Sequence, residues 1–262
     1  MVKRHFSVSY LAIVFVFLYA PIVVLIVFSF NAARSNSVWG GFSLTWYREL
    51  FHDRQIMTAL YYTLLIALLS ATISAVAGTA AAVGIHRMRP RIRKVFLAFN
   101  NLPVLNPDIV TGVSLMVLFT VLRFRLGFWT LLFSHITFNI PYVVLCILPK
   151  LRQLPAEVTE AAMDLGATPL WAFFRVVIPE IAPGIFTGLL IAFTLSIDDF
   201  VISFFTTGSG VSNLSIIVYS MARRGINPKI NAVSTLLFVT VFILLIIINK
   251  RDAVAKQLEV KK

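Results

Sequence analysis

The chain has 262 residues, of which 59% are hydrophobic and only 13% are charged, and its mean hydropathy is +0.89. A soluble domain carries about 25% charged residues, so this composition excludes an ordinary soluble protein and indicates a membrane protein. A formal net charge of +12 would suit a nucleic-acid-binding protein, but the cations cluster at the ends of apolar segments. We therefore expect a lipid bilayer, and no nucleic acid, around this chain.

Six apolar segments are long enough to cross a bilayer, which takes about 20 helical residues. They cover roughly residues 8–30, 59–85, 95–122, 128–149, 181–205 and 230–249. These segments predict an all-α membrane protein with six transmembrane helices. The first segment follows Lys3 and Arg4 as in a signal peptide, but at about 23 residues it is too long for one and predicts a retained helix.

The basic residues predict the orientation in the membrane. Of the 23 Lys and Arg residues, 15 lie at the two termini, in residues 87–94 or in residues 150–180, and 8 lie elsewhere. By the positive-inside rule, both termini and these two loops are cytoplasmic. The positive-inside rule alone explains the five cations between Arg87 and Lys94. The alternative is that they bind a partner protein or acidic lipid.

Aromatic residues characterise the first external loop, and small residues characterise the second span. Residues 31–58 carry three aromatic residues suited to the membrane–water interface, Trp39, Trp46 and Tyr47. In the second span, Gly78 and Ala82 have the spacing of small residues at which two membrane helices approach closely. This pair predicts tight helix packing.

Asp108 lies inside the third span, where a carboxylate costs about 2.5–3.5 kcal/mol on insertion scales and usually faces a cavity or a partner. Asn106, Pro107 and Asp108 also predict a helix restart, with Asn106 as the cap and Pro107 in the first turn. A helix broken at mid-membrane is a common transport site. The alternative is an acid that only stabilises the dipole of the restarted helix.

The fourth span contains His135 and the lone Cys146, which excludes an intramolecular disulfide. We interpret His135 as a hydrogen-bonded packing residue, because its own segment holds no acid to orient it as a catalytic base. An intramembrane hydrolase is therefore disfavoured.

Residues 150–180 are much longer than a connector needs, and they predict a helical hairpin. Pro155 would begin a first helix, and Gly166 would end it in the left-handed conformation. Thr168 would cap a second helix opened by Pro169, and Pro179 and Pro183 would end it before the fifth span. The second helix would expose bulky apolar side chains, which either pack on this chain or meet a soluble partner.

Asp198 and Asp199 lie in the fifth span, about 100° apart on a helix. They cannot both face one pathway, so we expect Asp198 to line it and Asp199 to pair with another group. Beyond this span, residues 214–224 predict an amphipathic helix at the external face, stopped by Gly225.

The hairpin carries a motif that resembles the permease subunits of bacterial ABC importers. The family pattern is Glu-Ala-Ala, three residues, Gly, nine residues, then Ile, any residue and Leu-Pro. The chain matches it at five positions, Glu160, Ala161, Ala162, Gly166 and Pro179, and has Val176 and Ile178 where the family has Ile and Leu. Over nearly its whole length the chain also resembles the smaller permeases of spermidine/putrescine importers, most clearly at residues 19–22, 107–110, 127–138 and 193–201.

This resemblance implies a single permease domain over residues 1–262 with the type I importer fold, in a bacterial cytoplasmic membrane. It implies that residues 169–175 form a coupling helix seated on a separate ATPase dimer, with Glu160 and Gly166 setting the bend and the apolar body supplying contact. That body includes Leu170, Phe173, Phe174 and Arg175. A second permease and an extracytoplasmic polyamine-binding protein are the other implied partners. The chain has no Walker A sequence, so ATP and Mg²⁺ belong to the ATPase, and we expect no catalytic residue, metal or cofactor in this chain.

A polyamine pathway needs separated carboxylates for the ammonium groups and aromatic surface for the methylenes. Asp108, Asp198 and Asp199 are the candidate acids. Cation–π contacts would come from Tyr142, Trp129 and Tyr219, each of which can equally be a packing residue. Two alternatives remain: a permease of the same fold for another small cationic or chelate cargo, and an ion-coupled secondary carrier.

Overall fold

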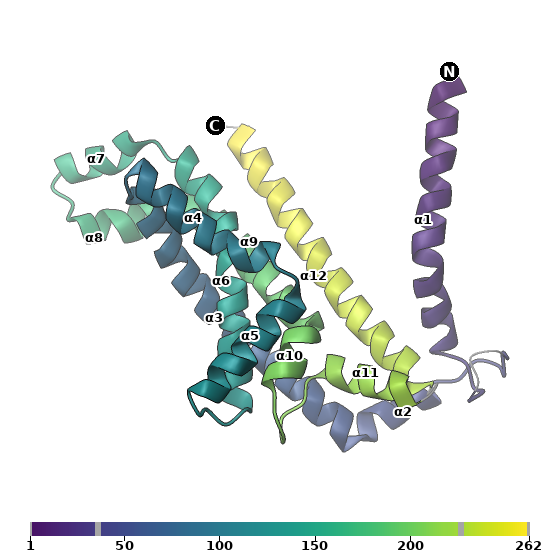
Figure 1. Ribbon diagram of the computed structural model, residues 1–262. Coiled ribbons are helices and arrows are strands. Elements are labelled where there is room, and N and C mark those ends of the chain that lie inside the picture. The colour runs from purple at the N-terminus through teal and green to yellow at the C-terminus, as the bar shows by residue number, and fades with distance from the viewer. Residues whose placement is uncertain (1, 35–37, 225–227, 261–262) are drawn as a thin grey trace. The chain divides into compact units, whose positions relative to one another are not determined.

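The computed structural model describes residues 2–34, 38–224 and 228–260, almost all of which lie in helices or the turns between them. The helices are α1 (Val2–Phe28), α2 (Thr45–His52), α3 (Arg54–Arg87), α4 (Pro90–Leu105), α5 (Asp108–Val121), α6 (Phe128–Gln153), α7 (Ala156–Asp164), α8 (Pro169–Ala172), a π-helical turn η1 (Phe173–Val177), α9 (Ile178–Asp198), α10 (Val201–Thr206), α11 (Leu214–Arg224) and α12 (Lys229–Val260) (Figure 1). The predicted all-α class is confirmed.

Four helices among the described residues are long and apolar enough to cross a membrane: Tyr10–Phe28, Arg54–Arg87, Phe128–Gln153 and Pro169–Asp198. The pair α4 and α5 passes the same test together, as one apolar segment bent by 105°. The described apolar part of α12, Lys229–Ile243, is shorter. The structure is therefore consistent with six spans, and the count of six stays a prediction.

The chain divides into two compact units, which we describe separately. The first comprises residues 1–59 and 217–242. Asn31 organises its loop: the Asn31 carbonyl accepts from Trp46 Nε1 at 2.7 Å, and its Oδ1 accepts from the Gly40 amide at 2.7 Å. Trp46 is only 6% exposed, so the expectation of an interfacial Trp46 is wrong. Its indole nitrogen is buried with the Asn31 carbonyl to which it donates.

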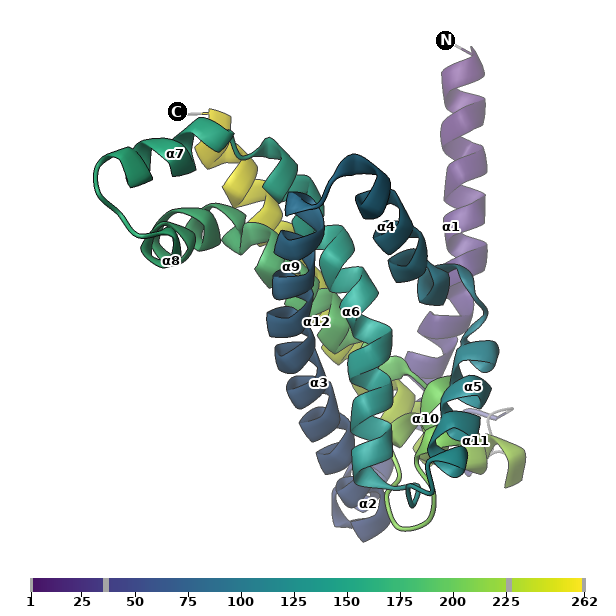
Figure 2. The same ribbon diagram turned by 60° about the vertical axis from the view of Figure 1, so that its left-hand side comes forward.

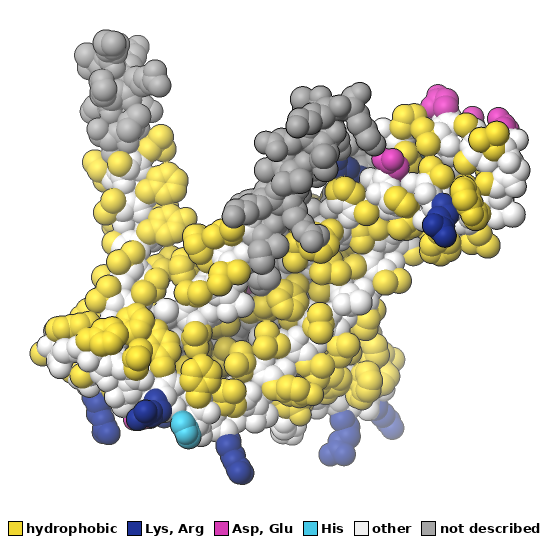
Figure 3. All heavy atoms as spheres, turned by 180° about the vertical axis from the view of Figure 1, so that it is seen from behind, with side chains coloured by type: hydrophobic (Ala, Val, Ile, Leu, Met, Phe, Trp, Pro, Cys, Tyr) yellow, Lys and Arg dark blue, Asp and Glu magenta, His cyan; other side chains and the backbone are white. Residues whose placement is uncertain are grey.

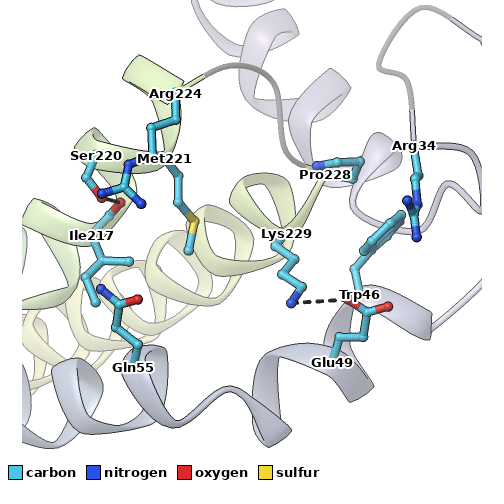
Figure 4. Close-up of a pocket in the computed structure, with 10 residues that line it drawn as sticks. All are labelled: Arg34, Trp46, Glu49, Gln55, Ile217, Ser220, Met221, Arg224, Pro228 and Lys229. Carbon is cyan, nitrogen blue, oxygen red and sulfur yellow. Dashed lines mark hydrogen bonds and ion pairs between the residues drawn. The ribbon is translucent and has the colours of Figure 1, made fainter.

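The first unit also contains a pocket of about 580 Å³ between α2 and the helices α11 and α12 (Figure 4). Lys229 Nζ lies 3.2 Å from Glu49 Oε2 at its edge and 3.6 Å from Asp53 Oδ2. The predicted external helix matches α11 at both ends, although Gly225, the expected stop, lies outside the described residues.

The second unit comprises residues 60–216 and 243–262, and its core lies between α3, α6 and α9. A Cβ at Gly78 would lie 2.6 Å from Val143 Cγ1, and one at Gly188 would lie 3.2 Å from the Val143 Cα. Glycine on α3 and on α9 therefore lets both helices approach α6 at Val143, which is fully buried. The small-residue prediction for the second span is confirmed at Gly78 (Figures 1 and 2).

Candidate functional site

The third apolar segment is interrupted where the sequence predicts. Helix α4 ends at Leu105 and α5 begins at Asp108, with a bend of 105° between their axes. The predicted cap is shifted by one residue: Asn106 is the C-cap of α4, and Pro107 is the N-cap residue of α5, without a side-chain capping bond. Pro107 has no backbone N–H and cannot donate a helical hydrogen bond back into α4, so it fixes the position of the break. Asp108, in the first turn of α5, is exposed.

The fifth apolar segment is interrupted as well, which corrects the expectation of a continuous span over 181–205. Helix α9 ends at Asp198, and α10 begins at Val201. The Asp199 carboxylate accepts hydrogen bonds from the amides of Ile202 at 3.2 Å and Ser203 at 2.7 Å. A carboxylate that accepts the first free amides of a helix stabilises its start, so Asp199 caps α10 and maintains the interruption.

The neighbouring residues orient Asp198. Ser196 is 2% exposed and Asp199 has a side chain that is 8% exposed; they lie three residues apart, hence on one face of the chain. Both make hydrogen bonds inside the second unit. Asp198 is on the opposite side and is exposed. The geometry separates the two acids: Asp199 serves α10, and Asp198 is available to a ligand.

The two interruptions lie in one region, because α5 packs on α10. A Cβ at Gly112 would lie 3.1 Å from Phe205 Cδ2 and 3.3 Å from Ile202 Cα. Gly112 is one turn after Asp108, and Ile202 follows Asp199 by three residues. Two helix C-termini, of α4 and α9, thus end near two exposed carboxylates. Helix C-termini carry partial negative charge, and broken helices present them to cations in transport proteins.

The three candidate aromatic residues belong to different units of the chain. Tyr142, on α6, lies within electrostatic reach of Asp108. Trp129 is 65% exposed, but 13 residues of α6, about 20 Å, separate it from Tyr142. Tyr219 belongs to the first unit, and the Arg223 guanidinium lies 5.9 Å from its ring centre. Within the second unit, the structure thus relates Tyr142, and not Trp129, to Asp108.

Residues 150–180 form the predicted hairpin. Gly166 has φ of +91°, and its amide bonds to the Met163 carbonyl while the Ala167 amide bonds to the Ala162 carbonyl. This pair of bonds with a left-handed glycine is the Schellman motif, which ends α7. Thr168 Oγ1 then accepts from the Trp171 amide at 3.3 Å and caps α8. The sequence-based description of both turns is confirmed, except that Pro155 precedes α7 as its N-cap residue.

The end of the second hairpin helix differs from the prediction. Pro179 and Pro183 do not terminate it: α8 continues through η1 into α9. The π-helical turn of residues 173–177 is wider than an α-turn, and it ends two residues before Pro179. Wide turns of this kind relieve the clash between a proline ring and the preceding turn. Helices α8 and α9 are therefore joined through η1 without a break, up to the interruption at Asp198.

The hairpin displays apolar and charged side chains together. Leu170 is 71% exposed, Trp171 54% and Phe174 61%, whereas Phe173 is half-buried and packs on the core. Glu160, Ala161, Arg175 and Pro179 are exposed, and Ala162 is half-buried. Figure 3 shows acidic side chains gathered around this hairpin. Large exposed apolar side chains, which on this hairpin also include Leu165 at 91%, are typical of a protein docking surface.

A buried histidine, serine and aspartate lie together at α10, and sequence reasoning missed this group. His135 Nε2 lies 3.0 Å from Ser203 Oγ and 3.6 Å from Asp199 Oδ2, while Ser203 Oγ bonds directly to the same Oδ2 at 2.7 Å. In a hydrolytic triad the acid binds the histidine nitrogen that faces away from the serine. Here both contacts use one nitrogen, so the group has no relay geometry. Within the described residues, no cluster of His, Cys, Asp and Glu fits a metal ion.

Interrupted apolar helices, exposed acids at the interruptions and a protruding hairpin together define a helical membrane transport subunit. Comparisons with known proteins agree. The family model described as "Binding-protein-dependent transport system inner membrane component" matches residues 74–258. The putrescine transport system permease protein PotI of Escherichia coli K12 is 42% identical over 90% of this chain and 87% of that protein. The spermidine/putrescine transport system permease protein PotC of the same strain is 37% identical over 94% and 93%.

The chain therefore belongs to the family of binding-protein-dependent transport system inner membrane components. Members of this family are transport subunits, not enzymes. Among solved structures, a chain of a bacterial ABC transporter that imports the polysaccharide alginate matches with a TM-score of 0.72, 17% identity and coverage of 98% and 97%. A chain of the methionine transporter MetNI matches with a TM-score of 0.63, 20% identity and coverage of 76% and 96%. These likenesses show the type I importer permease fold.

Proposed function

We propose that this chain is one permease of an ATP-driven importer that moves polyamines across a bacterial cytoplasmic membrane. The observation that carries the proposal is the pair of exposed carboxylates, Asp108 and Asp198, at two helix interruptions that share one region. The permease names of the 42% and 37% identical relatives, which refer to putrescine and spermidine, support the choice of cargo.

The charge of the site favours a cation with several separated charges. An uncompensated carboxylate inside a membrane is costly, and a passing ammonium group reduces that cost. The Asp199 carboxylate already serves the α10 amides, so Asp108 and Asp198 supply two separate points of attraction. Tyr142, within electrostatic reach of Asp108, would offer a ring face for a methylene chain or an ammonium group. Trp129 and Tyr219 would act elsewhere along the route or only in packing.

The hairpin α7–α8 is the proposed contact with the ATPase. Leu170, Trp171 and Phe174 would fill an apolar groove on that partner, and the Gly166 turn would present them. Because α8 runs through η1 into α9, a push on the hairpin would move α9 and therefore Asp198. ATP and Mg²⁺ would bind the ATPase dimer, and this chain would hold neither.

The proposed assembly contains a second permease, an ATPase dimer and an extracytoplasmic polyamine-binding protein. The hairpin and both termini would be cytoplasmic, supported by the 15 cations that flank those segments against 8 elsewhere. We treat residues 1–262 as one permease domain with six spans. The apolar part of α1, Tyr10–Phe28, is not buried. It would meet lipid or the second permease.

A competition experiment tests the cargo. Uptake of labelled spermidine by the reconstituted complex with internal ATP would be measured against unlabelled putrescine, a monoamine of equal length, and a metal chelate. Putrescine should compete and the monoamine should not, because only a diamine reaches two acids. ATP-dependent uptake of the labelled chelate, with no uptake of spermidine, would replace the polyamine with another cargo while keeping the permease.

A further inference from the structure

Four buried polar side chains from three segments meet at the α9–α10 interruption. They are His135 on α6, Asp199 and Ser203 at the start of α10, and Asn213 before α11, and we call them the polar node. His135 is 2% exposed, Ser203 0% and Asn213 3%, and the Asp199 side chain is 8% exposed. Burying polar groups costs free energy unless they are hydrogen-bonded to one another, so this node favours one particular arrangement of the three segments.

Only one assignment of donors and acceptors fits the hydrogen bonds around Ser203 in the node. Ser203 Oγ donates its only proton to Asp199 Oδ2 at 2.7 Å, because a carboxylate can only accept. Ser203 Oγ must therefore accept from Asn213 Nδ2 at 2.7 Å and from His135 Nε2 at 3.0 Å. This requires the tautomer of His135 with its proton on Nε2. Each of the three partners thus depends on the others through Ser203.

Asn213 also joins the two sides of the interruption. Its Nδ2 donates to the Asp199 backbone carbonyl at 3.0 Å, and its Oδ1 accepts from the Ile216 amide at 3.0 Å. The first bond satisfies a carbonyl that the end of α9 leaves without a helical partner, and the second caps the first turn of α11. The Asn213 side chain therefore holds both the backbone at Asp199 and the start of α11.

A second set of bonds holds the residue on the other side of Asp198. Ser196 Oγ lies 2.8 Å from Asn139 Nδ2 and 3.0 Å from Ser70 Oγ, so α9 is tied to α6 and α3 two residues before Asp198. The node ties the chain down one residue after Asp198. Asp198 itself is exposed between these two attachments. The attachments on both sides of it therefore constrain its direction.

We propose that His135 and Asn213 are positioning residues that hold Asp198 toward the transport pathway through the Asp199–Ser203 pair. Neither side chain touches the cargo. The role of Asp198 in the pathway rests on the proposed function above, whereas its fixed direction rests on the node alone. The two parts therefore call for two separate readouts.

The first readout measures the direction of residue 198 without transport. The complex would carry Asp198→Cys in a Cys146→Ser background, which leaves one thiol in this chain, and would be reconstituted in lipid vesicles. The rate of reaction with a quaternary-ammonium thiosulfonate reports access to position 198. Asn213→Ala and His135→Ala should each slow this reaction by about tenfold, the factor expected when a buried hydrogen bond is lost.

Two matched variants separate positioning from misfolding. His135→Gln places an amide N–H near the position of Nε2, so it should restore most of the labelling rate that His135→Ala loses. Ser212→Ala, next to Asn213 with a single 3.4 Å bond to the Asn213 carbonyl, should leave the rate unchanged. Equal rates for Asn213→Ala, His135→Ala and the parent would overturn the proposal, as would a His135→Gln rate no better than that of His135→Ala.

The second readout uses the native Asp198 and measures polyamine uptake. Asn213→Ala should raise the KM about tenfold while lowering the maximal rate less, because the acid is present but misdirected. Slower labelling with an unchanged KM would overturn the link between Asp198 and the cargo. A wild-type complex that moves no polyamine would refute the proposed function instead, and the labelling rates would still decide whether the node positions residue 198.

Discussion

Gly166→Ala should weaken coupling between the hairpin and transport through backbone strain alone. Gly166 has φ of +91°, which an L-residue with a Cβ rarely adopts, and a Cβ at this position would meet no atom within 4 Å. The cost is therefore that of the left-handed conformation, about 1–2 kcal/mol. This free energy lowers the population of the observed turn relative to its alternatives by a factor of about 5–30.

The assay is ATP hydrolysis by the reconstituted complex, with and without binding protein and polyamine, compared with the uptake rate. Gly166→Ala should reduce the ratio of uptake to hydrolysis, and Gly166→Asn should reduce it less, because Asn tolerates the left-handed region. Gly84→Ala is the matched control: its Cβ also meets no atom within 4 Å, but Gly84 is inside α3 and has no positive φ. If Ala and Asn at position 166 are equally harmful, or if Gly84→Ala is as harmful as Gly166→Ala, the backbone argument is wrong.

Three further substitutions test the packing, the cap and the ion pair. Gly78→Leu should prevent stable assembly, because even a Cβ would lie 2.6 Å from Val143 Cγ1; thermal stability in detergent measures this, and a melting temperature equal to wild type would contradict it. Thr168→Ala removes the bond to the Trp171 amide and should cost about 1 kcal/mol of hairpin stability. Faster proteolysis within residues 165–172 should report it, and unchanged cleavage would count against the cap. Lys229→Met should change stability by at most about 1 kcal/mol, since partly exposed ion pairs are weak; a larger loss of melting temperature would show a structural role for that pair.

Local sequence signals predicted the hairpin well. A left-handed glycine, a capping threonine and a proline in the first helical turn each act over a few residues, so Gly166, Thr168 and Pro169 were sufficient to place α7 and α8. The break at Pro107 was predictable for the same reason. The continuation through Pro179 was not, because it depends on a π-helical turn that no single residue type specifies.

The arrangement around Asp198 was only partly predictable. The helical angle between successive residues showed that Asp198 and Asp199 could not share a direction, but it did not show which one faced inward. The decision comes from bonds between distant residues: His135 to Ser203 over 68 positions, and Asn139 to Ser196 over 57. A search for an acid within the His135 segment could not find Asp199. One usable signal was present, since a Ser four residues after an Asp is placed to donate both its amide and its hydroxyl to that carboxylate.

The central claim is that ATP drives a polyamine past Asp108 and Asp198. The most direct measurement is uptake of labelled spermidine into proteoliposomes that hold the whole complex, with and without internal ATP, for wild type, Asp108→Asn and Asp198→Asn. The account predicts uptake only with ATP, and at least tenfold slower uptake in each variant at the same level of assembly, since about 1.4 kcal/mol of lost attraction is tenfold. Uptake that is indifferent to ATP would contradict the coupling, and full uptake in both variants would contradict the acidic pathway.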